Sequence, residues 1–430
     1  MTSPIGDGDC HGPEGPRNDS PIEGGDCHRL NSPRNGTETR ESAVLLLIKR
    51  KHYAILYVYF YAHWAKRIGF LTFFPGSGEG GFGERDHMEK ILSIIVPSYN
   101  AEKFLDVGIP SFLEESVLDF LDIIIVNDGS TDATAEKAQV YVDRHPGSVR
   151  LISQVNKGHG GALNTGCAAA QGKFLRIVDA DDWVQTRNLA PFVEFLRTCQ
   201  SDAVLNHYRT VDISTGEIAE RRLPEDALGK VLSLKDMMNK RSGFERLFAL
   251  HAITYRTDFY REKGIQLTEH VFYEDVEYAT IPLCLAKTIS CVDLYLYEYR
   301  IGDVTQSVSD SSQLKRISHV CKVLDRMIRE YVRLADQLDE GQNWLYCIKT
   351  RSLLLRGCTT MLLLEPDRAK GRRMAEEQVA LMRSRMPRVY AMMHKEYQML
   401  RMMNILHISK NQWDGFLQSA LYHKLRNLLR

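Results

Sequence analysis

The stretch that decides the fold reads ILSIIV at residues 91–96 and continues as PSYN at residues 97–100. A short apolar run of this kind is typical of a strand buried on both faces of a parallel sheet. Three further apolar runs have the length of strands: residues 122–126, 149–153 and 174–178. Helices are expected between them, opened by polar or glycine-containing turns after Asn100, Ser130 and His159. This alternation predicts an α/β domain with a mostly parallel sheet, which binds its ligands beyond the carboxyl ends of the strands.

The chain ahead of this domain has a different composition. Residues 1–42 are rich in glycine, proline, serine and asparagine and repeat short motifs at an offset of 17 residues, which predicts disorder. The apolar run 53–62 is too short for a membrane-spanning helix, which needs about 20 residues. We therefore expect that Met88 is the biological start and that residues 1–87 are a disordered or spurious extension. The α/β domain is expected at 88–310.

Beyond residue 310 the pattern becomes helical. Apolar residues recur at spacings of three and four between Ile317 and Leu338, as in a bundle helix or a coiled coil. This predicts an all-α C-terminal domain at 311–430. Its last stretch, 416–430, mixes leucines with basic residues, and such a helix packs either on its own bundle or on an anionic membrane surface.

Composition limits the class of protein. With 430 residues, of which 44% are hydrophobic and 26% are charged, the chain is a globular protein of two or three domains. The formal net charge of zero argues against a nucleic-acid-binding protein, but residues 311–430 carry +11 and residues 1–310 carry −11. Nine cysteines without a C-x-x-C pair indicate neither a zinc site nor a disulfide framework. We expect a cytoplasmic protein that is either free in the cytoplasm or peripheral on the inner membrane face.

The most specific motif follows the fourth predicted strand and reads DADDW at residues 179–183. Three carboxylates within four residues repel one another unless a cation neutralises them. Oxygen ligands of this kind favour Mg²⁺ or Mn²⁺, and Mg²⁺ typically shares its carboxylates with substrate phosphates. A solvated acidic turn ahead of the next helix is the alternative.

Other polar segments also follow predicted strands. Tyr99 offers a flat ring for a base or a sugar, and the Asp128 carboxylate can accept a hydrogen bond from a uracil ring N–H. The glycine-rich stretch 156–166 lacks a G-x-G-x-x-G pattern directly after a strand, which excludes a dinucleotide-binding loop. Residues 166–173 have five residues rather than four between their glycines, which excludes a phosphate-binding NTPase loop.

Four motifs in this order, V-P-S-Y-N, N-D-G-S-T-D, N-x-G-x-x-x-A-x-N-x-G and D-A-D-D-W, resemble those of inverting family 2 glycosyltransferases. The similarity runs from about Lys90 to Asp310. It implies a GT-A fold, the α/β fold of nucleotide-diphospho-sugar transferases, with the all-α domain behind it. It also implies an inverting transferase of the hexosyltransferase type that uses a UDP-sugar donor and Mn²⁺ or Mg²⁺. The expected acceptor is a saccharide or a lipid-linked saccharide in cell-surface polysaccharide synthesis. No nucleic acid is expected as a partner, and peripheral membrane contact through the basic C-terminal helices is the alternative to their packing on the bundle.

The same resemblance assigns residues to the metal and to the donor. The metal ligands would be Asp181 and Asp182. The donor would be held by residues at the strand ends and in the glycine-rich stretch: Pro97, Tyr99, Asp128, Lys157, Asn164 and Asp179. The family often has arginine where this chain has Leu163, so Lys157 or Arg176 is expected to supply the missing contact.

The catalytic base is expected in HVFYEDVEY, residues 270–278. This segment resembles the family's E-D motif, which implies Asp275 as the base for the acceptor hydroxyl, with Glu274 orienting it or standing in for it. A helix that opens with acidic residues is the alternative. Arg300, in a segment that resembles the loop after the base, would neutralise the leaving diphosphate. A sugar nucleotidyltransferase and a non-catalytic saccharide-binding protein are the rival functions.

Overall fold

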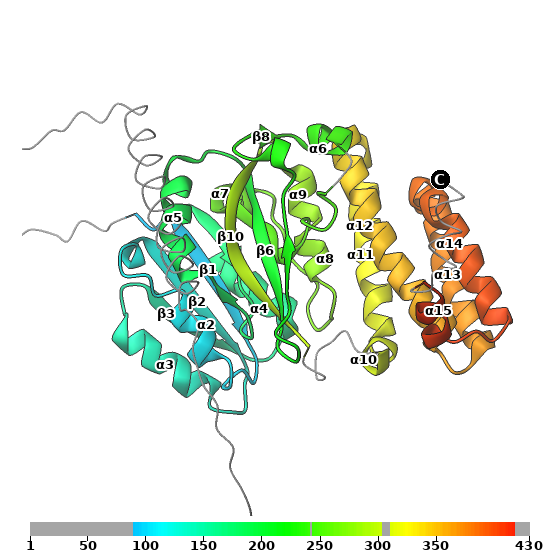
Figure 1. The fold of residues 1–430 in the computed structure, drawn as a ribbon, viewed down its shortest axis with the longest axis horizontal. Helices are drawn as coiled ribbons and strands as arrows, with labels where there is room; N and C mark the ends of the chain where they lie inside the picture. Colours follow the sequence, from blue (N-terminus) through cyan, green and yellow to red (C-terminus); the bar gives the residue numbers. More distant parts are fainter. Residues whose placement is uncertain (1–88, 241–242, 303–309, 418–430) are drawn as a thin grey trace, which may run out of the picture. The chain divides into compact units, whose positions relative to one another are not determined.

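The computed structural model describes residues 89–417 except 241–242 and 303–309 (Figure 1). The predictions for residues 1–87, for the apolar run 53–62 and for the side chains of the basic stretch 416–430 lie outside the described residues. In the part described, no helix combines the length and apolar character needed to cross a membrane. All of these residues belong to one compact unit, Arg85–Arg430. The boundary near residue 310 therefore stays a prediction.

Strands within the described residues form one mixed sheet. They are β1 (Leu92–Ser98), β2 (Leu121–Asp128), β3 (Val149–Gln154), β4 (Phe174–Ile177), β5 (Trp183–Val184), β6 (Ala203–Asp212), β7 (Ile218–Arg221), β8 (Val231–Leu232), β9 (Ile253–Arg256) and β10 (Ile289–Ile301). Their order is β3-β2-β1-β4-β9-β6-β10-β5, with β7 on β6 and β8 on β10. The first four strands run parallel, which confirms the predicted α/β fold, and β10 runs parallel to β6. Strand β9 is antiparallel to both of its neighbours, β4 and β6.

The helices belong to two parts of the chain. Those of the α/β part are α2 (Leu105–Ser111), α3 (Thr134–Arg144), α4 (Gly158–Ala169), α5 (Leu189–Thr198), α6 (Leu234–Lys240), α7 (Thr257–Glu262), α8 (Asp275–Tyr278) and α9 (Ile281–Leu285). Those of the C-terminal part are α10 (Asp310–Lys315), α11 (Ile317–Leu334), α12 (Glu340–Thr359), α13 (Arg368–Arg385), α14 (Pro387–Ile405) and α15 (Lys410–Leu417). The second set confirms the predicted helical C-terminal region.

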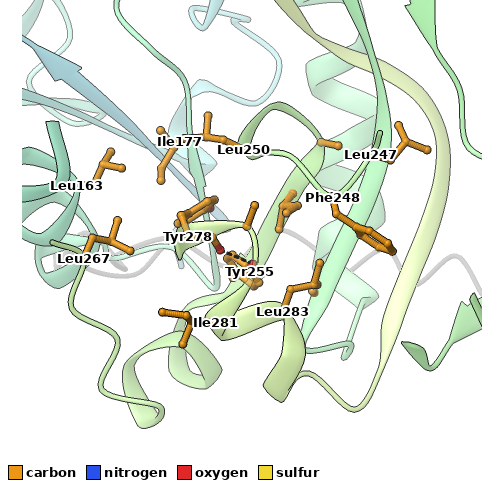
Figure 2. Close-up of a cluster of buried hydrophobic side chains, with 14 of the residues drawn as sticks. Leu163, Ile177, Leu247, Phe248, Leu250, Tyr255, Leu267, Tyr278, Ile281 and Leu283 are labelled. Atoms are coloured by element: carbon orange, nitrogen blue, oxygen red, sulfur yellow. Dashed lines mark hydrogen bonds between the residues drawn. The ribbon is translucent and has the colours of Figure 1, made fainter. Parts of the chain in front are cut away.

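The core of the α/β part fastens α8 to the sheet. Every residue of β1, β2 and β4 is buried, as their continuous apolar runs require. Figure 2 shows Leu163 of α4, Ile177 of β4 and Tyr278 of α8 in one buried cluster with Tyr255 of β9. The Tyr255 hydroxyl donates a hydrogen bond to the Tyr278 carbonyl oxygen at 2.9 Å. Because α8 begins at Asp275, this core also fixes the start of the predicted base segment.

Helix α12 joins the C-terminal helices to the α/β part. Its first turn is closed by a capping box, in which the Asp339 side chain accepts from the Gln342 N–H and the Gln342 side chain accepts from the Asp339 N–H. The helix packs against α11 and α14 and also against α6 and α9. Lys349 donates from Nζ to the Phe248 carbonyl oxygen at 2.6 Å. Helix α11 (yellow in Figure 1) packs against α12 and α13, so its apolar stripe belongs to a bundle face and not to a coiled coil.

Candidate active site

Carboxylates from several elements meet where the parallel strands end. Asp128 is the last residue of β2, and Asp179 comes two residues after β4. Parallel strands place their carboxyl ends at the same edge, so these side chains share one side of the sheet. The turn that holds Asp179, Asp181 and Asp182 ends at the two-residue strand β5, which pairs with β10.

His159, in the first turn of α4, lies between two carboxylates. Its Nε2 is 2.9 Å from Asp179 Oδ1, and its Nδ1 is 2.5 Å from Glu274 Oε1. Burial alone would lower the pKa of His159, but the two carboxylates outweigh burial and hold it well above its ordinary value. The glycine-rich helix start is thereby tied to the DADD turn and to the predicted base segment.

Glycines allow the α4 turn to approach the base segment this closely. Gly158 has a φ of +75°, and a Cβ there would lie 3.0 Å from the His270 backbone. A Cβ on Gly160 would collide with the Thr268 carbonyl oxygen. The His270 N–H donates to the Lys157 carbonyl oxygen at 2.8 Å. The glycine-rich stretch thus serves close backbone packing against residues 268–275.

Asp182 fastens β10 to the turn. It is 1% exposed, its Oδ2 accepts from the Tyr297 hydroxyl at 2.5 Å, and its Oδ1 accepts from the Arg300 N–H at 2.7 Å. The Tyr297 oxygen in turn accepts from the Asp179 N–H at 3.1 Å. Burial, then Asp181, raises the pKa of Asp182 well above its ordinary value. Arg300, whose guanidinium lies 4.7 Å from the Phe104 ring, is held beside the carboxylates by its own backbone.

The carboxylates fit a divalent cation. Burial and the neighbouring Asp179 raise the pKa of Asp181 to about 6, a repulsion that a cation would relieve. Ligand atoms of Asp179, Asp182 and His251 all lie within 4.8 Å of one another. Burial lowers the pKa of His251 to about 4, and its buried Nδ1 has no hydrogen-bond partner. A neutral imidazole among carboxylate oxygens is a donor set suited to a transition-metal dication such as Mn²⁺.

Asp275 lies with this cluster and faces solvent. Its side chain is exposed, whereas Glu274 is only 3% exposed and is bound to His159. Burial raises the pKa of Tyr299, and four carboxylates raise it further: Asp182, Asp179, Asp275 and Asp181. The structure therefore brings the predicted base and the predicted metal ligands together around one tyrosine.

The predicted donor-binding residues lie in different environments. Pro97 is buried in β1, and Tyr99, just beyond the strand, is 55% exposed. Asp128 is 2% exposed and its Oδ1 accepts from Gln154 Nε2 at 2.7 Å and from the Lys157 N–H at 2.9 Å. The Lys157 side chain itself is exposed.

Two other predicted contacts do not join the cluster. The Asn164 amide donates to the Leu267 carbonyl oxygen at 3.0 Å and accepts from the Leu267 N–H at 2.8 Å, so it ties α4 to the base segment. Arg176 is fully buried in β4 and donates to Asn206 and Thr254, both at under 3 Å, and to the His251 carbonyl oxygen. Arg176 therefore does not supply the expected phosphate or base contact, and of the two substitutes only Lys157 reaches solvent.

Three residues of the site were not identified from the sequence: His159, His251 and Tyr297. The signal that could have revealed His159 is its position as the one imidazole inside the glycine-rich stretch. His251 and Tyr297 carry no local motif and reach the site only because β9 and β10 join the sheet. The rings of His251 and Tyr297 form a T-shaped contact, with centroids 4.8 Å apart.

Comparisons with known proteins agree with this geometry. Residues 93–262 match the family model for glycosyl transferase family 2. The chain is 27% identical over 240 residues to the glycosyltransferase GlyG of Streptococcus pneumoniae serotype 4, covering 54% of this chain and 79% of GlyG. It is 31% identical over 224 residues to the glycosyltransferase EpsJ of Bacillus subtilis, covering 50% of this chain and 62% of EpsJ, less than two thirds of that protein.

Two more similarities are shorter or confined to the fold. A 95-residue stretch, 22% of this chain, is 38% identical to 14% of the chondroitin synthase of Escherichia coli. Residues 1–349 of TarS from S. aureus, crystallised with UDP-GlcNAc, superpose with a TM-score of 0.55 at 20% identity. That superposition covers 75% of this chain and 89% of the TarS chain.

Proposed function

Because residues 93–262 match the model of glycosyl transferase family 2, we propose that this chain is an inverting, metal-dependent enzyme of that family, which moves a sugar from a UDP-sugar to a saccharide or lipid-linked saccharide. The observation that carries the proposal is the exposed Asp275 beside the carboxylates of the DADD turn. TarS, which shares the fold and was crystallised with UDP-GlcNAc, supports UDP as the donor nucleotide. The similarity to a chondroitin synthase supports a role in polysaccharide synthesis.

Asp275 takes the proton of the acceptor hydroxyl in the proposed reaction. The hydroxyl oxygen attacks the anomeric carbon as the bond to the nucleotide diphosphate breaks on the opposite face, which inverts the configuration in one displacement. Glu274, held by His159, fixes the start of α8 from which Asp275 projects. Because Glu274 is buried, we assign it the role of orienting Asp275 and assign proton transfer to Asp275.

The leaving diphosphate needs positive charge. When bound, a divalent cation supplies that charge, and the residues that would hold it are Asp181 and Asp182, with Asp179 and His251 beside them. Arg300, placed next to Asp181 by its backbone contact with Asp182, adds a permanent cation on the same side.

Nucleotide release tests this proposal directly. The purified protein is incubated with a panel of UDP-sugars and with GDP-mannose, with and without Mn²⁺, and the freed nucleotide is measured. We expect slow release from one UDP-sugar that depends on Mn²⁺ and is lost in Asp181→Ala. Asp143→Ala, which removes an exposed carboxylate of α3, serves as the matched control and should retain full release.

Other outcomes identify other functions. Full nucleotide release by Asp181→Ala would exclude a metal role for the DADD turn. Formation of a UDP-sugar from a sugar phosphate and UTP would indicate a nucleotidyltransferase. Sugar binding without any release would indicate a saccharide-binding protein.

The base is tested by Asp275→Asn, which keeps the size of the side chain and removes its basicity. Transfer to the acceptor should fall by about 10²–10⁴-fold, which is the usual contribution of general base catalysis to the rate. Binding of UDP, followed by calorimetry, should remain within about twofold of the unaltered protein. A variant that loses UDP binding would place Asp275 in the donor site instead.

A further inference from the structure

The helical part of the chain contributes cations to the segment that holds Asp275. Arg316, the residue before α11, lies with its guanidinium 3.5 Å from the centroid of the Phe272 ring. Arg356 of α12 lies 5.7 Å from the centroid of the Tyr273 ring. Phe272 and Tyr273 directly precede Glu274 and Asp275 in the chain.

A third cation, Lys349, lies on the same side of α12. Asp275 raises its pKa and Arg356 lowers it, although burial has the largest effect. Arg356 and Arg316 lower the pKa of Tyr273 while Asp275 raises it, again against a larger effect of burial. Arg356 and Asp275 therefore lie near both Lys349 and Tyr273, and Arg316 lies near Tyr273. We call Arg316, Lys349 and Arg356 the cationic face.

Within the described residues, no carboxylate forms an ion pair with the cationic face. Other arginines of these helices do have such partners: Arg326 and Arg333 pair with Glu330 at 3.0 and 2.7 Å, and Arg351 pairs with Glu396 at 2.6 Å. Nη1 of Arg316 is buried without a hydrogen-bond partner. Lys349 has one partner, the neutral Phe248 carbonyl oxygen.

This arrangement costs stability unless an anion completes it. Like charges that share a site repel one another, and a buried donor without a partner keeps its full desolvation penalty. An arginine stacked on an aromatic ring keeps the edge of its guanidinium open for planar, bidentate binding of an oxyanion. Phosphate has the charge and the oxygen geometry that such donors match.

We propose that the cationic face binds a phosphate group of the acceptor and so brings the acceptor hydroxyl to Asp275. The proposal rests on the proposed glycosyltransferase function and names a class of acceptor for it. The phosphate belongs either to the diphosphate of a lipid-linked saccharide or to a phosphodiester in a polymer chain, and the same donors suit both.

Calorimetric titration of the full chain with two probes tests the site. Geranyl diphosphate represents a lipid diphosphate, and glycerophosphoglycerol represents a phosphodiester. We expect at least one probe to bind, with an affinity that falls as ionic strength rises. The double variant R316Q/R356Q should bind that probe more weakly by about a hundredfold, about tenfold for each charge-assisted hydrogen bond that the substitutions remove.

The control is R329Q/R373Q, which removes two exposed arginines from α11 and α13 and changes the net charge equally. It should bind the probe within about twofold of the unaltered protein. Because Arg316 is partly buried, R356Q alone is measured as well, and its affinity should fall by about tenfold while its melting temperature stays unchanged.

The two probes distinguish the two possible sources of the phosphate group. Binding of geranyl diphosphate alone supports a lipid-linked acceptor, and binding of glycerophosphoglycerol alone supports a polymer. Equal binding by R316Q/R356Q and its control, or no binding of either probe, overturns the proposal. Since the titration needs no turnover, a failure of sugar transfer counts against the proposed function and leaves this result intact.

Discussion

At the scale of single residues, His159 connects the two halves of the site. One imidazole contacts Asp179, at the end of β4, and Glu274, at the start of α8. Its raised pKa keeps it charged, so that it offsets two carboxylates, one of which is almost fully buried. We therefore regard His159 as a positioning residue that fixes the predicted base segment relative to the DADD turn.

Replacement of His159 by glutamine should uncouple the two halves. Transfer should fall by about tenfold to a hundredfold with little change in the KM for the donor, because the substitution would misplace the proposed base, Asp275, more than the proposed donor-binding residues. The free energy of unfolding should fall by about 3 kcal/mol, since buried Glu274 loses its ionic partner. Steady-state kinetics and urea unfolding measure both effects. His145→Gln, at the end of α3, is the control, and an equal kinetic loss in it would refute the positioning role.

Glu277 of α8 makes stability depend on pH. It is fully buried, and its carboxylate accepts from the Thr268 N–H at 2.9 Å and from the Thr268 hydroxyl at 2.7 Å. Burial raises the pKa of Glu277 to about 7 despite these hydrogen bonds. Below its ordinary value of 4.5 the folded and unfolded states are both protonated. As pH rises from there to about 7, only the unfolded state releases its proton, so the folded state loses stability.

Glu277→Gln should remove this pH dependence. At each pH, the free energy of unfolding of the variant is compared with that of the unaltered protein. This difference should be about 2.5 kcal/mol more favourable to the variant at pH 8.5 than at pH 5. Urea unfolding at the two pH values measures the difference. Glu376→Gln, on the exposed side of α13, should change by less than about 0.5 kcal/mol between them. If Glu277→Gln changes the free energy of unfolding equally at both pH values, the Glu277 carboxyl of the unaltered protein is ionised at neutral pH in the folded state.

At the scale of elements, the sequence predicts the parallel strands well. Residues 91–96, 122–126, 149–153 and 174–178 became β1 to β4 with shifts of one or two residues at their ends. A strand buried on both faces must be a continuous apolar run, and this signal is local. Strand β6 (AVLNHYRTVD) mixes polar with apolar residues, and β9 has only four residues, so neither carries such a signal.

The site residues divide in the same way, into those with a local sequence signal and those without one. The DADD turn and Asp128 were predictable because they lie at the ends of continuous apolar runs. His251 was not, because it lies 69 positions beyond Asp182 and approaches it only through the antiparallel strand β9. The hydrogen bond between Tyr297 and Asp182 likewise spans 115 positions and depends on the pairing of β10 with β5. The spacing of residues along the chain cannot predict such long-range contacts.

The contact between α12 and α6 gives a prediction at this scale. A Cβ on Gly341, in the first turn of α12, would collide with backbone atoms of Leu234 and Lys235. Gly341→Ala should lower the free energy of unfolding by about 2 kcal/mol, because overpacking outweighs the gain of about 1 kcal/mol in helix propensity. Gly147→Ala, where no atom lies within 4 Å, should be nearly neutral. Thermal unfolding of both variants measures the contrast, and a Gly341→Ala protein as stable as the control would refute the close contact.

At the scale of the whole molecule, the helical part covers the α/β part. Phe248 is fully buried, and its ring meets the edge of Trp344 on α12 at 5.8 Å between centroids. Cys284 of α9 contacts the Gln342 carbonyl oxygen at 3.4 Å. Removal of the helices would expose this apolar surface to water, at about 25 cal/mol for each Å².

We therefore expect that residues 85–310 do not fold stably alone. A chain truncated after residue 310 should aggregate, or should melt at least about 10 °C below the chain 85–430, since loss of a packed layer removes several kcal/mol. Size-exclusion chromatography and calorimetry compare the two. A truncated chain that stays monomeric with an unchanged melting temperature would establish residues 88–310 as a self-sufficient domain.

The late position of β10 in the sheet has a consequence for biosynthesis. Asp128 and the DADD turn leave the ribosome early, but His251, Asp275 and Tyr297 follow 69, 93 and 115 residues after Asp182. Strands β1 to β4 can pair during synthesis, since they are neighbours in the chain and in the sheet. A nascent chain that stops before residue 289 would hold an acidic sheet edge without the tyrosine that binds Asp182. Catalytic competence is therefore acquired in one late step, when β10 closes over a site whose first residues have long been in place.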